Sequence, residues 1–460
     1  MKFIVLIIGI IGILPLALLL RSNVYIRDKV WILLGVMPFM LVVTPFMSVA
    51  IITWDQIWFS YVPGLQITVI DLIAVALFFS MKDQKICVHY HLPFILYLIA
   101  ISFSVFQAEK PPAAIFYVWQ FARMYFFAVV IAKGCTEQKT ATLLLKGLAI
   151  GLGIQAVAVF WQKFGLHEVE PSGTFVHRNT LGLIIHMVIF PHFSLYLAGQ
   201  RQAQYALTPL MGLAVASLIA SRAALGFSIF GFATTYLLSL VRKPSSWKAL
   251  MGFTGIVIVA VAVPIAYSSL ERRFDVTPLM DDQYDERAAF NRTALAMLSA
   301  NPFGVGVNHY SYIGKNHGYS ISNGVVPTEG SLNNTVHNAY LLAGAEAGYF
   351  GIFAFIILTL YPLLVALKYA WLSNRKDLRG DLLLGLGVAM ITAYVHSFFE
   401  YVIVVKEVQY VLMITFGMTF GLAHQIKTDR MQYRSKLNKQ AIYSESTKTK
   451  QTTWDDTQRC

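Results

Sequence analysis

Apolar segments long enough, or nearly long enough, to cross a bilayer recur along most of the chain. A helix needs about 20 apolar residues to span the hydrocarbon core. The pattern therefore predicts an all-α, polytopic membrane protein of about 12 to 13 transmembrane helices, the first being the least certain to span. The predicted helices lie near residues 3–20, 30–47, 66–81, 93–107, 114–132, 144–164, 180–198, 205–220, 223–241, 249–267, 337–367, 381–399 and 407–424.

Composition supports this class and excludes a soluble domain. Of the 460 residues, 57% are hydrophobic and only 13% are charged, whereas soluble domains are about one quarter charged. Arg21 and Ser22, and no small-residue cleavage site, follow the first apolar segment, so we interpret it as a spanning helix and not as a signal peptide. The three cysteines show no metal-ligand spacing and predict no structural disulfide.

Basic residues gather in every second loop, which predicts the orientation of the chain in the membrane. This parity places the carboxyl-terminal tail inside the cell and the amino terminus outside. If the first segment does not span, both termini are inside. The net charge of +12 reflects this bias and does not indicate a nucleic-acid partner. The inner loops carry Arg21, Arg27, Lys29, Lys82, Lys85, Lys133, Lys139, Arg201, Arg242, Lys243, Lys248, Lys368, Arg375, Lys376 and Arg379.

The pattern divides the chain into five regions. Amino-terminal helices (1–110) precede central helices (111–267), a long outer loop (268–336), carboxyl-terminal helices (337–424) and a basic tail (425–460) that we expect to be disordered. Within the outer loop, Asp285–Ala300 predicts a short amphipathic helix. The polar run 315–335 predicts a mobile flap.

Three arginines lie on the outer face, two at the ends of apolar segments and one at the start of the amphipathic helix of the outer loop. A guanidinium at the membrane edge costs about 1–3 kcal/mol unless it snorkels or pairs. They are Arg178, Arg222 and Arg287. A single arginine of this kind would be interpreted as one that snorkels to lipid headgroups. Three on the less basic face favour an external anion, and a phosphate or diphosphate suits the guanidinium fork.

A histidine lies at the same surface. His337 opens the apolar segment 337–367, and in a continuous helix it would share a face with Gly344, Gly348 and Gly351. It is either a helix-start residue beside a packing strip or a base that takes a proton from an acceptor hydroxyl. The acidic run at 281–286 reads as a solvated loop, so we expect metal-independent chemistry.

Four short motifs, in order along the chain, resemble those of the bacterial O-antigen ligase and polymerase family, which also contains protein O-oligosaccharyltransferases. The resemblance covers about residues 150–425. The motifs are His337-Asn338 with Gly348 and Gly351; Arg287-Ala-Ala-Phe-Asn-Arg292 followed by Asn301-Pro-Phe-Gly-Val-Gly306; Gly173-Thr-Phe-Val-His-Arg-Asn179; and Ser221-Arg-Ala-Ala224.

The resemblance implies a multi-pass glycosyltransferase of the bacterial inner membrane, with its active site and the long loop in the periplasm. It implies an undecaprenyl-diphosphate-linked glycan donor and transfer with inversion, without metal or other cofactor. Carried onto this sequence, His337 and Arg287 are catalytic, and His337 acts as base or positions the acceptor. The implied diphosphate ligands are Arg178, Arg222, Arg287 and, second in rank, Arg292; the implied supporting residues are Asn179, Asn338, Gly348 and Gly351.

The sequence leaves three acceptors of the glycan as alternatives. Lipid A-core would make the protein a ligase, the slightly favoured reading; another lipid-linked repeat unit, of O-antigen or exopolysaccharide, would make it a polymerase; a protein Ser or Thr would make it an O-oligosaccharyltransferase. A different class, a transporter of lipid-linked glycan, would place charged residues inside its helices. Here Asp71, Gln155 and His396 are the exceptions, which we interpret as helix–helix hydrogen-bonding groups. A purely structural membrane protein would make the motifs accidental.

Overall fold

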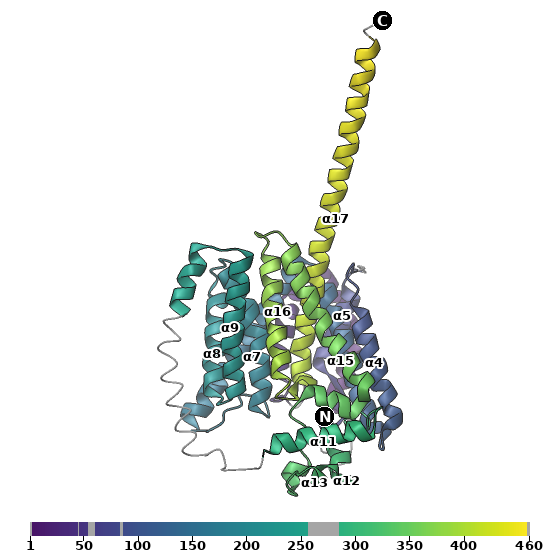
Figure 1. Cartoon of the computed structure of the whole chain (residues 1–460), viewed down its shortest axis with the longest axis vertical. Coiled ribbons are helices and arrows are strands. Elements are labelled where there is room, and N and C mark those ends of the chain that lie inside the picture. Colours follow the sequence, from purple (N-terminus) through teal and green to yellow (C-terminus); the bar gives the residue numbers. More distant parts are fainter. Residues whose placement is uncertain (1, 45, 54–59, 83–85, 256–284, 458–460) are drawn as a thin grey trace.

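The computed structural model describes residues 2–44, 46–53, 60–82, 86–255 and 285–457. It confirms an all-α membrane protein in which long helices form one bundle (Figure 1). The long helices are α1 (Lys2–Ser22), α2 (Val24–Val36), α3 (Val69–Ser80), α4 (His91–Ser104), α5 (Pro111–Gly134), α6 (Gln138–Phe160), α7 (Arg178–Leu197), α8 (Ala203–Leu218), α9 (Arg222–Arg242), α15 (Ala339–Leu372), α16 (Leu378–His396) and α17 (Lys406–Thr457). Shorter ones are η1 (Met37–Phe39), η2 (Val105–Gln107), η3 (Trp161–Gly165), α11 (Glu286–Ala300), α12 (Tyr310–Asn316), α13 (Tyr319–Ser322), α14 (Glu329–Leu332) and η4 (Val402–Val404).

The expected 12 to 13 spans include segments that lie outside the described residues. Among the described residues, seven helices are long and apolar enough to cross a membrane, and three shorter apolar helices accompany them. The segment expected at 30–47 is interrupted because Pro38 ends α2 and starts the 3-10 turn η1. The segment expected at 249–267 lies largely outside the described residues.

The centre of the bundle is built from α7, α16 and the first part of α17. Nearly all side chains of α7 and α16 are buried. The two helices approach closely where α16 carries Gly385, because a Cβ there would lie 2.7 Å from the carbonyl oxygen of Phe190. At the periphery, α1 exposes Ile4, Ile8 and Ile11, as a lipid-facing helix does.

The two ends of the bundle differ. The short helices α11, α12 and α13 lie at one end, and α17 leaves the bundle at the other (Figure 1). The start of α16 contacts α17 at this second end, through Arg379 and Asp429. This arrangement agrees with the separation of basic and less basic loops, and the membrane side of each end stays a prediction.

Two polar segments take helical form, and whether either is disordered or mobile stays a prediction. The tail expected to be disordered continues α17 as far as Thr457, because residues 425–457 contain neither Gly nor Pro and many residues with good helix propensity. The run 315–335 contains the end of α12 and all of α13 and α14, and Lys315 of α12 contacts Glu329 of α14 at 2.7 Å on the surface. Whether this run moves stays a prediction.

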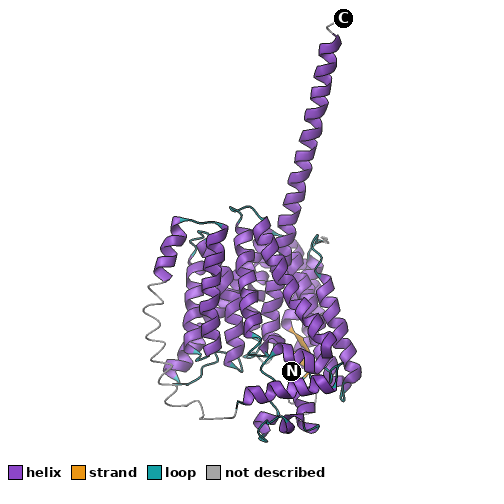
Figure 2. Cartoon of the chain, viewed as in Figure 1, coloured by secondary structure: helices purple, strands orange, loops and turns teal. Residues whose placement is uncertain are grey.

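A two-stranded hairpin escaped the sequence analysis. Strand β1 (Ser48–Thr53) pairs antiparallel with β2 (Gly64–Thr68), whose last residues lie in the helix expected at 66–81 (Figure 2). The hairpin is anchored to α17, since Lys406 Nζ donates to Gln66 Oε1 at 2.8 Å. The strands are short, and their residues are only partly buried and alternate weakly between apolar and polar. The hydrophobic pattern therefore gave a weak strand signal.

Helix α15 breaks at Gly348, and the outer loop docks into the break. Gly348 has φ +70° and ψ −168°, a conformation open almost only to glycine. The break frees backbone groups of α15 for the segment after α11: Val305 N donates to Ala345 O at 3.0 Å, and Tyr349 N donates to Pro302 O at 3.0 Å. The glycine motif thus locks the outer loop onto the bundle.

A buried carboxylate strengthens this lock. Glu346, two residues before the break, is 1% exposed and accepts the backbone N–H groups of His309 and Tyr310, each at 2.9 Å. It also accepts the hydroxyl of Tyr61 from the hairpin segment. One side chain therefore joins α15, the outer loop and the residues before β2.

Replacing Gly348 by alanine should destabilise the protein. The new Cβ would collide with Pro302 O and Phe303 in a backbone conformation that alanine avoids, at a cost of at least about 1–3 kcal/mol. Equilibrium unfolding in mixed micelles measures the effect. Gly330→Ala is the matched control, because nothing lies within 4 Å of a Cβ there. Equal stability of the two variants would contradict the proposed lock.

Candidate functional site

A buried glutamate that the sequence analysis did not single out is the centre of the site. Glu400 lies between α16 and η4 and is 2% exposed. One carboxylate oxygen, Oε2, accepts from His337 Nδ1 at 3.0 Å. The other, Oε1, accepts from Arg287 Nη2 at 3.0 Å and from Asn179 Nδ2. Segments distant in sequence, before α15 and at the starts of α11 and α7, therefore meet at one carboxylate.

His337 is held in place by the start of α15. Asn338 is the N-cap of this helix, and its side chain accepts the N–H groups of Tyr340 and Leu341, each at 3.0 Å. The helix therefore begins after His337. The expectation that His337 shares a helical face with Gly344, Gly348 and Gly351 is wrong, because His337 precedes the helix and the helix breaks at Gly348.

Two aromatic rings and one carboxylate fix the imidazole of His337. The rings of Phe290 and Tyr401 lie 6.1 and 5.8 Å from it, centroid to centroid. Burial, and then the charge of Glu400, raises the pKa of Tyr401, so its hydroxyl stays protonated at neutral pH. An ionised carboxylate only accepts, so the proton of neutral His337 is assigned to Nδ1. Nε2 then carries the free lone pair, as in a general base.

The starts of four helices converge on this carboxylate. Arg287 is the second residue of α11, whose N-cap is Asp285. Asn179 is the second residue of α7, and its Oδ1 accepts from the hydroxyl of Ser221 at 3.3 Å. Ser221 is the N-cap of α9, and His337 precedes the N-cap of α15. Because helix N-termini carry positive partial charge, this arrangement attracts anions.

The arginines predicted from the sequence divide into two groups. Arg178 and Arg222 are the first residues of α7 and α9, beside Asn179 and Ser221, so they lie at the same convergence as Arg287. Arg178 forms an ion pair with Glu170 of the preceding loop. Arg292 instead donates to Asn323 O from Nε and Nη2, at 3.3 and 3.1 Å, and joins α11 to the end of α13.

The supporting residues have identifiable structural positions. Asn179 contacts Glu400, and Asn338 caps α15. Gly348 forms the helix break, and Gly351 lies just after it, where a Cβ would collide with the Cβ of Ala347. The proposed functional roles of these residues, and of all the predicted site residues, stay predictions.

Glu400 was missed although the sequence carried a signal for it. It interrupts the run Ser397-Phe-Phe-Glu-Tyr401 between two apolar segments. A carboxylate is costly in such a place without partners, so its position marked it as a residue to which the outer arginines and His337 could bind.

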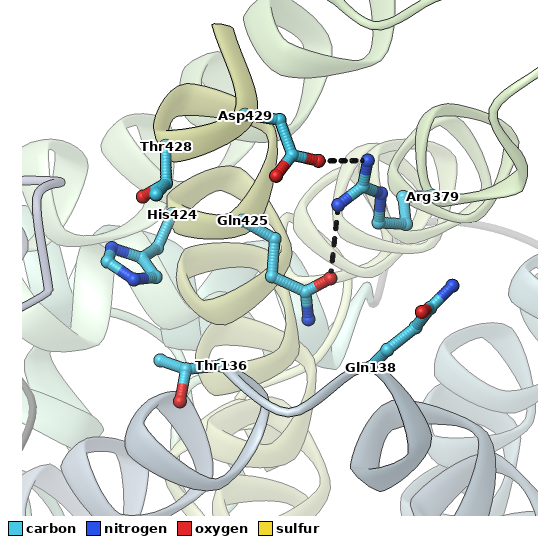
Figure 3. Close-up of a pocket in the computed structure, with 7 residues that line it drawn as sticks. All are labelled: Thr136, Gln138, Arg379, His424, Gln425, Thr428 and Asp429. Carbon is cyan, nitrogen blue, oxygen red and sulfur yellow. Dashed lines mark hydrogen bonds and ion pairs between the residues drawn. The ribbon is translucent and has the colours of Figure 1, made fainter. Parts of the chain in front are cut away.

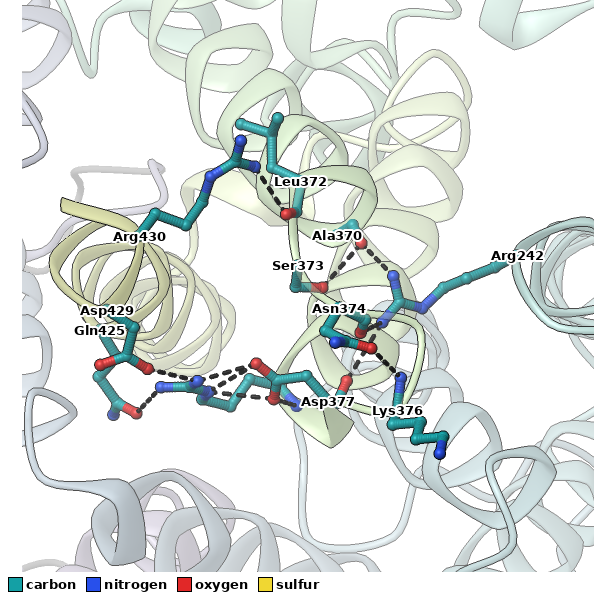
Figure 4. A network of polar contacts seen from close by, with 11 residues as sticks. Arg242, Ala370, Leu372, Ser373, Asn374, Lys376, Asp377, Gln425, Asp429 and Arg430 are labelled. Carbon is teal, nitrogen blue, oxygen red and sulfur yellow. Dashed lines mark hydrogen bonds and ion pairs between the residues drawn. The ribbon is translucent and has the colours of Figure 1, made fainter. Parts of the chain in front are cut away.

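A separate polar cavity lies at the other end of the bundle (Figure 3). It has a volume of about 370 Å³. Its arginine, Arg379, is already bonded to Asp377 at 2.8 Å and Asp429 at 2.6 Å, within a polar network that also includes buried Arg242 (Figure 4). These contacts hold α15, α16 and α17 together. The cavity is lined by Thr136, Gln138, Arg379, His424, Gln425, Thr428 and Asp429, so none of the predicted site residues lines it.

Comparison with known proteins identifies the family. Residues 187–356 match the family model described as O-Antigen ligase. The match supports the resemblance of this chain to the O-antigen ligase family. The family is one of membrane glycosyltransferases of the O-antigen ligase or polymerase type, so the resemblance drawn from the motifs is confirmed. A search of curated proteins finds no match.

The matched region contains part of the candidate site. It includes Arg222, Arg287 and His337, whereas Arg178 precedes it and Glu400 follows it. In the folded chain both residues come close to the matched region. Glu400 reaches it through its hydrogen bonds, and Arg178 reaches it because the start of α7 lies beside α9.

Removing the Glu400 side chain should destabilise the protein. Glu400→Ala leaves the buried donors of Asn179 and His337 without their acceptor, which costs about 1–3 kcal/mol. Equilibrium unfolding in mixed micelles measures this cost. Glu329→Ala is the control, because Glu329 belongs to an exposed surface pair and its loss should change stability little. A Glu400→Ala variant as stable as the control would contradict the central position of this carboxylate.

Proposed function

We propose that this chain is an inverting, metal-independent glycosyltransferase that moves a glycan from undecaprenyl diphosphate to an acceptor hydroxyl. We place the reaction at the periplasmic face of the bacterial inner membrane, in the biosynthesis of a surface polysaccharide such as lipopolysaccharide O-antigen or exopolysaccharide. The observation that carries the proposal is the Glu400–His337 contact at 3.0 Å amid convergent helix N-termini and arginines.

His337 is the base in this proposal. Its Nδ1–H donates to Glu400, which leaves the Nε2 lone pair to take the proton of the acceptor hydroxyl. The acceptor oxygen forms a bond to the anomeric carbon as the bond from that carbon to the diphosphate oxygen breaks. A single displacement of this kind inverts the configuration. Glu400 orients the imidazole and stabilises the imidazolium that forms.

The arginines stabilise the leaving group. As the glycosyl bond breaks, negative charge builds on the departing undecaprenyl diphosphate, and guanidinium groups aimed at it lower the barrier. Arg287 supports this role because its side chain is 52% exposed although one nitrogen binds Glu400. Arg178 and Arg222, at the starts of α7 and α9, supply the other positive groups in the proposal.

The acceptor is tested by the products. Purified protein receives an undecaprenyl-diphosphate-linked repeat unit, with lipid A-core or without another acceptor, and the products are analysed by mass. A lipid A-core glycan identifies a ligase, which we favour, and a ladder of lengthening lipid-linked glycan identifies a polymerase. If folded protein forms neither product, a Ser- or Thr-containing protein acceptor is tested next. Failure there as well would contradict the glycosyltransferase proposal and favour the transport of lipid-linked glycan.

His337→Ala should lower the rate of transfer by at least about 100-fold, the usual contribution of a general base, without loss of folded protein. His317→Ala is the matched control. His317 directly follows α12 in the outer loop and is exposed beside Glu109. Its variant should therefore retain the wild-type rate. Initial rates with saturating acceptor measure both. Transfer by the His337→Ala variant at the rate of the control would contradict the role of His337.

A further inference from the structure

We propose that Glu170 is a built-in competitor of the substrate: it occupies Arg178 in the empty protein and is displaced when a diphosphate anion binds. The inference rests on the proposed function for the identity of that anion as the headgroup of a lipid-linked donor. It assigns a role to the loop between α6 and α7, most of which precedes the sequence motif that contains Arg178.

Two glutamine side chains hold this loop in place. Gln162 binds both backbone groups of Gly173: Gly173 N donates to Oε1 at 2.8 Å, and Nε2 donates to Gly173 O at 2.9 Å. Gln155 accepts from Thr174 N at 2.8 Å. Gly173 has φ +65°, and a Cβ there would collide with Gln155. The loop is therefore fixed on α6 from both sides of the turn, and this fixes where Glu170 can reach.

The ion pair between Glu170 and Arg178 is asymmetric. The side chain of Arg178 is 21% exposed and that of Glu170 is 48% exposed. Within the described part of the chain, Arg178 Nη1 is shielded from solvent and has no aligned hydrogen-bond acceptor, although the Glu170 carboxylate lies beside it. The acid can swing into water while the guanidinium stays in place. A phosphate oxygen, which suits the guanidinium fork, can therefore replace it.

The surroundings favour an anion that arrives on a lipid. The same loop exposes Leu166, Val169 and Val176, by 55%, 74% and 86%. The end of α6 adds exposed Phe160 and Phe164, whose rings lie 4.6 Å apart. An apolar surface beside a cation matches an amphiphile with a negative headgroup. The shared chemistry is a diphosphate, attached to a polyprenyl chain or free in water.

The test measures binding without turnover. Full-length protein in nanodiscs is titrated with undecaprenyl diphosphate, and separately with inorganic diphosphate. Glu170→Gln keeps the shape of the side chain and removes its charge, so it should bind undecaprenyl diphosphate about 3- to 10-fold more tightly than wild type. Tighter binding of both probes indicates recognition of the diphosphate alone, and tighter binding of only the lipid indicates that the tail contributes.

Glu168→Gln is the matched control. Glu168 lies in the same loop, two residues away, and is exposed, so its variant changes the loop charge equally but leaves the Glu170–Arg178 pair intact. It should bind both probes as wild type does. Glu170→Asp, which shortens the acid and loosens the contact, should tighten binding to a smaller extent and replaces Glu170→Gln if that variant does not fold.

Binding by the Glu170 variants equal to that of wild type, or to that of Glu168→Gln, would overturn the inference. Weaker binding would overturn it as well, because it would make Glu170 part of the binding surface. Because the titration needs no acceptor and no reaction, its result is separate from the proposed function. Protein that binds more tightly after Glu170→Gln but transfers no glycan would retain the inference and reject the glycosyltransferase.

Discussion

The arrangement of the site depends on one constraint: a carboxylate buried beside the membrane must find hydrogen-bond donors. Glu400 satisfies it with His337, Arg287 and Asn179. To deliver these donors, the starts of α7, α11 and α15 come to one place, and α9 joins them through Ser221. The groups that satisfy Glu400 are also those that suit an acid–base reaction on an anionic substrate. In the proposed mechanism, stability and chemistry therefore place the same demand on this part of the chain.

A second buried carboxylate performs a mechanical task nearby. Glu346 and the break at Gly348 attach the outer loop and the hairpin segment to the outer half of α15. The loop carries α11, which begins with Arg287, so the lock at the break helps to determine where that guanidinium lies. The motif glycines and the motif arginine, more than 50 residues apart in sequence, thus belong to one mechanical unit. A change at Gly348 would therefore act on the candidate site through the position of α11.

The sequence predicted those residues of the candidate site whose chemical type is unusual for their position in the chain. Arg178, Arg222, Arg287 and His337 stand out because charged groups are costly at the ends of apolar helices, and the structure places each of them at or beside the convergence of helix starts. The sequence could not show which partner they share, because Glu400 lies 63 positions after His337 and only the packing of α16 brings it back.

Other expectations from the sequence missed structural detail for physical reasons of the same kind. A period of 3.6 predicts a helix but not its interruption, so the glycine face assigned to His337 disappeared once α15 began after it and broke at Gly348. The hairpin was hidden by short, weakly alternating strands. Low hydrophobicity suggested disorder after residue 424, whereas helix propensity without Gly or Pro extends α17 through the tail.

The most direct measurement is an experimental structure of the full chain in nanodiscs with undecaprenyl diphosphate bound. The account predicts that the diphosphate lies among Arg178, Arg222 and Arg287, that His337 Nδ1 stays bonded to Glu400, and that His337 Nε2 faces the ligand. A diphosphate bound in the polar cavity at the opposite end of the bundle, or an imidazole turned away from Glu400 beside the ligand, would contradict it.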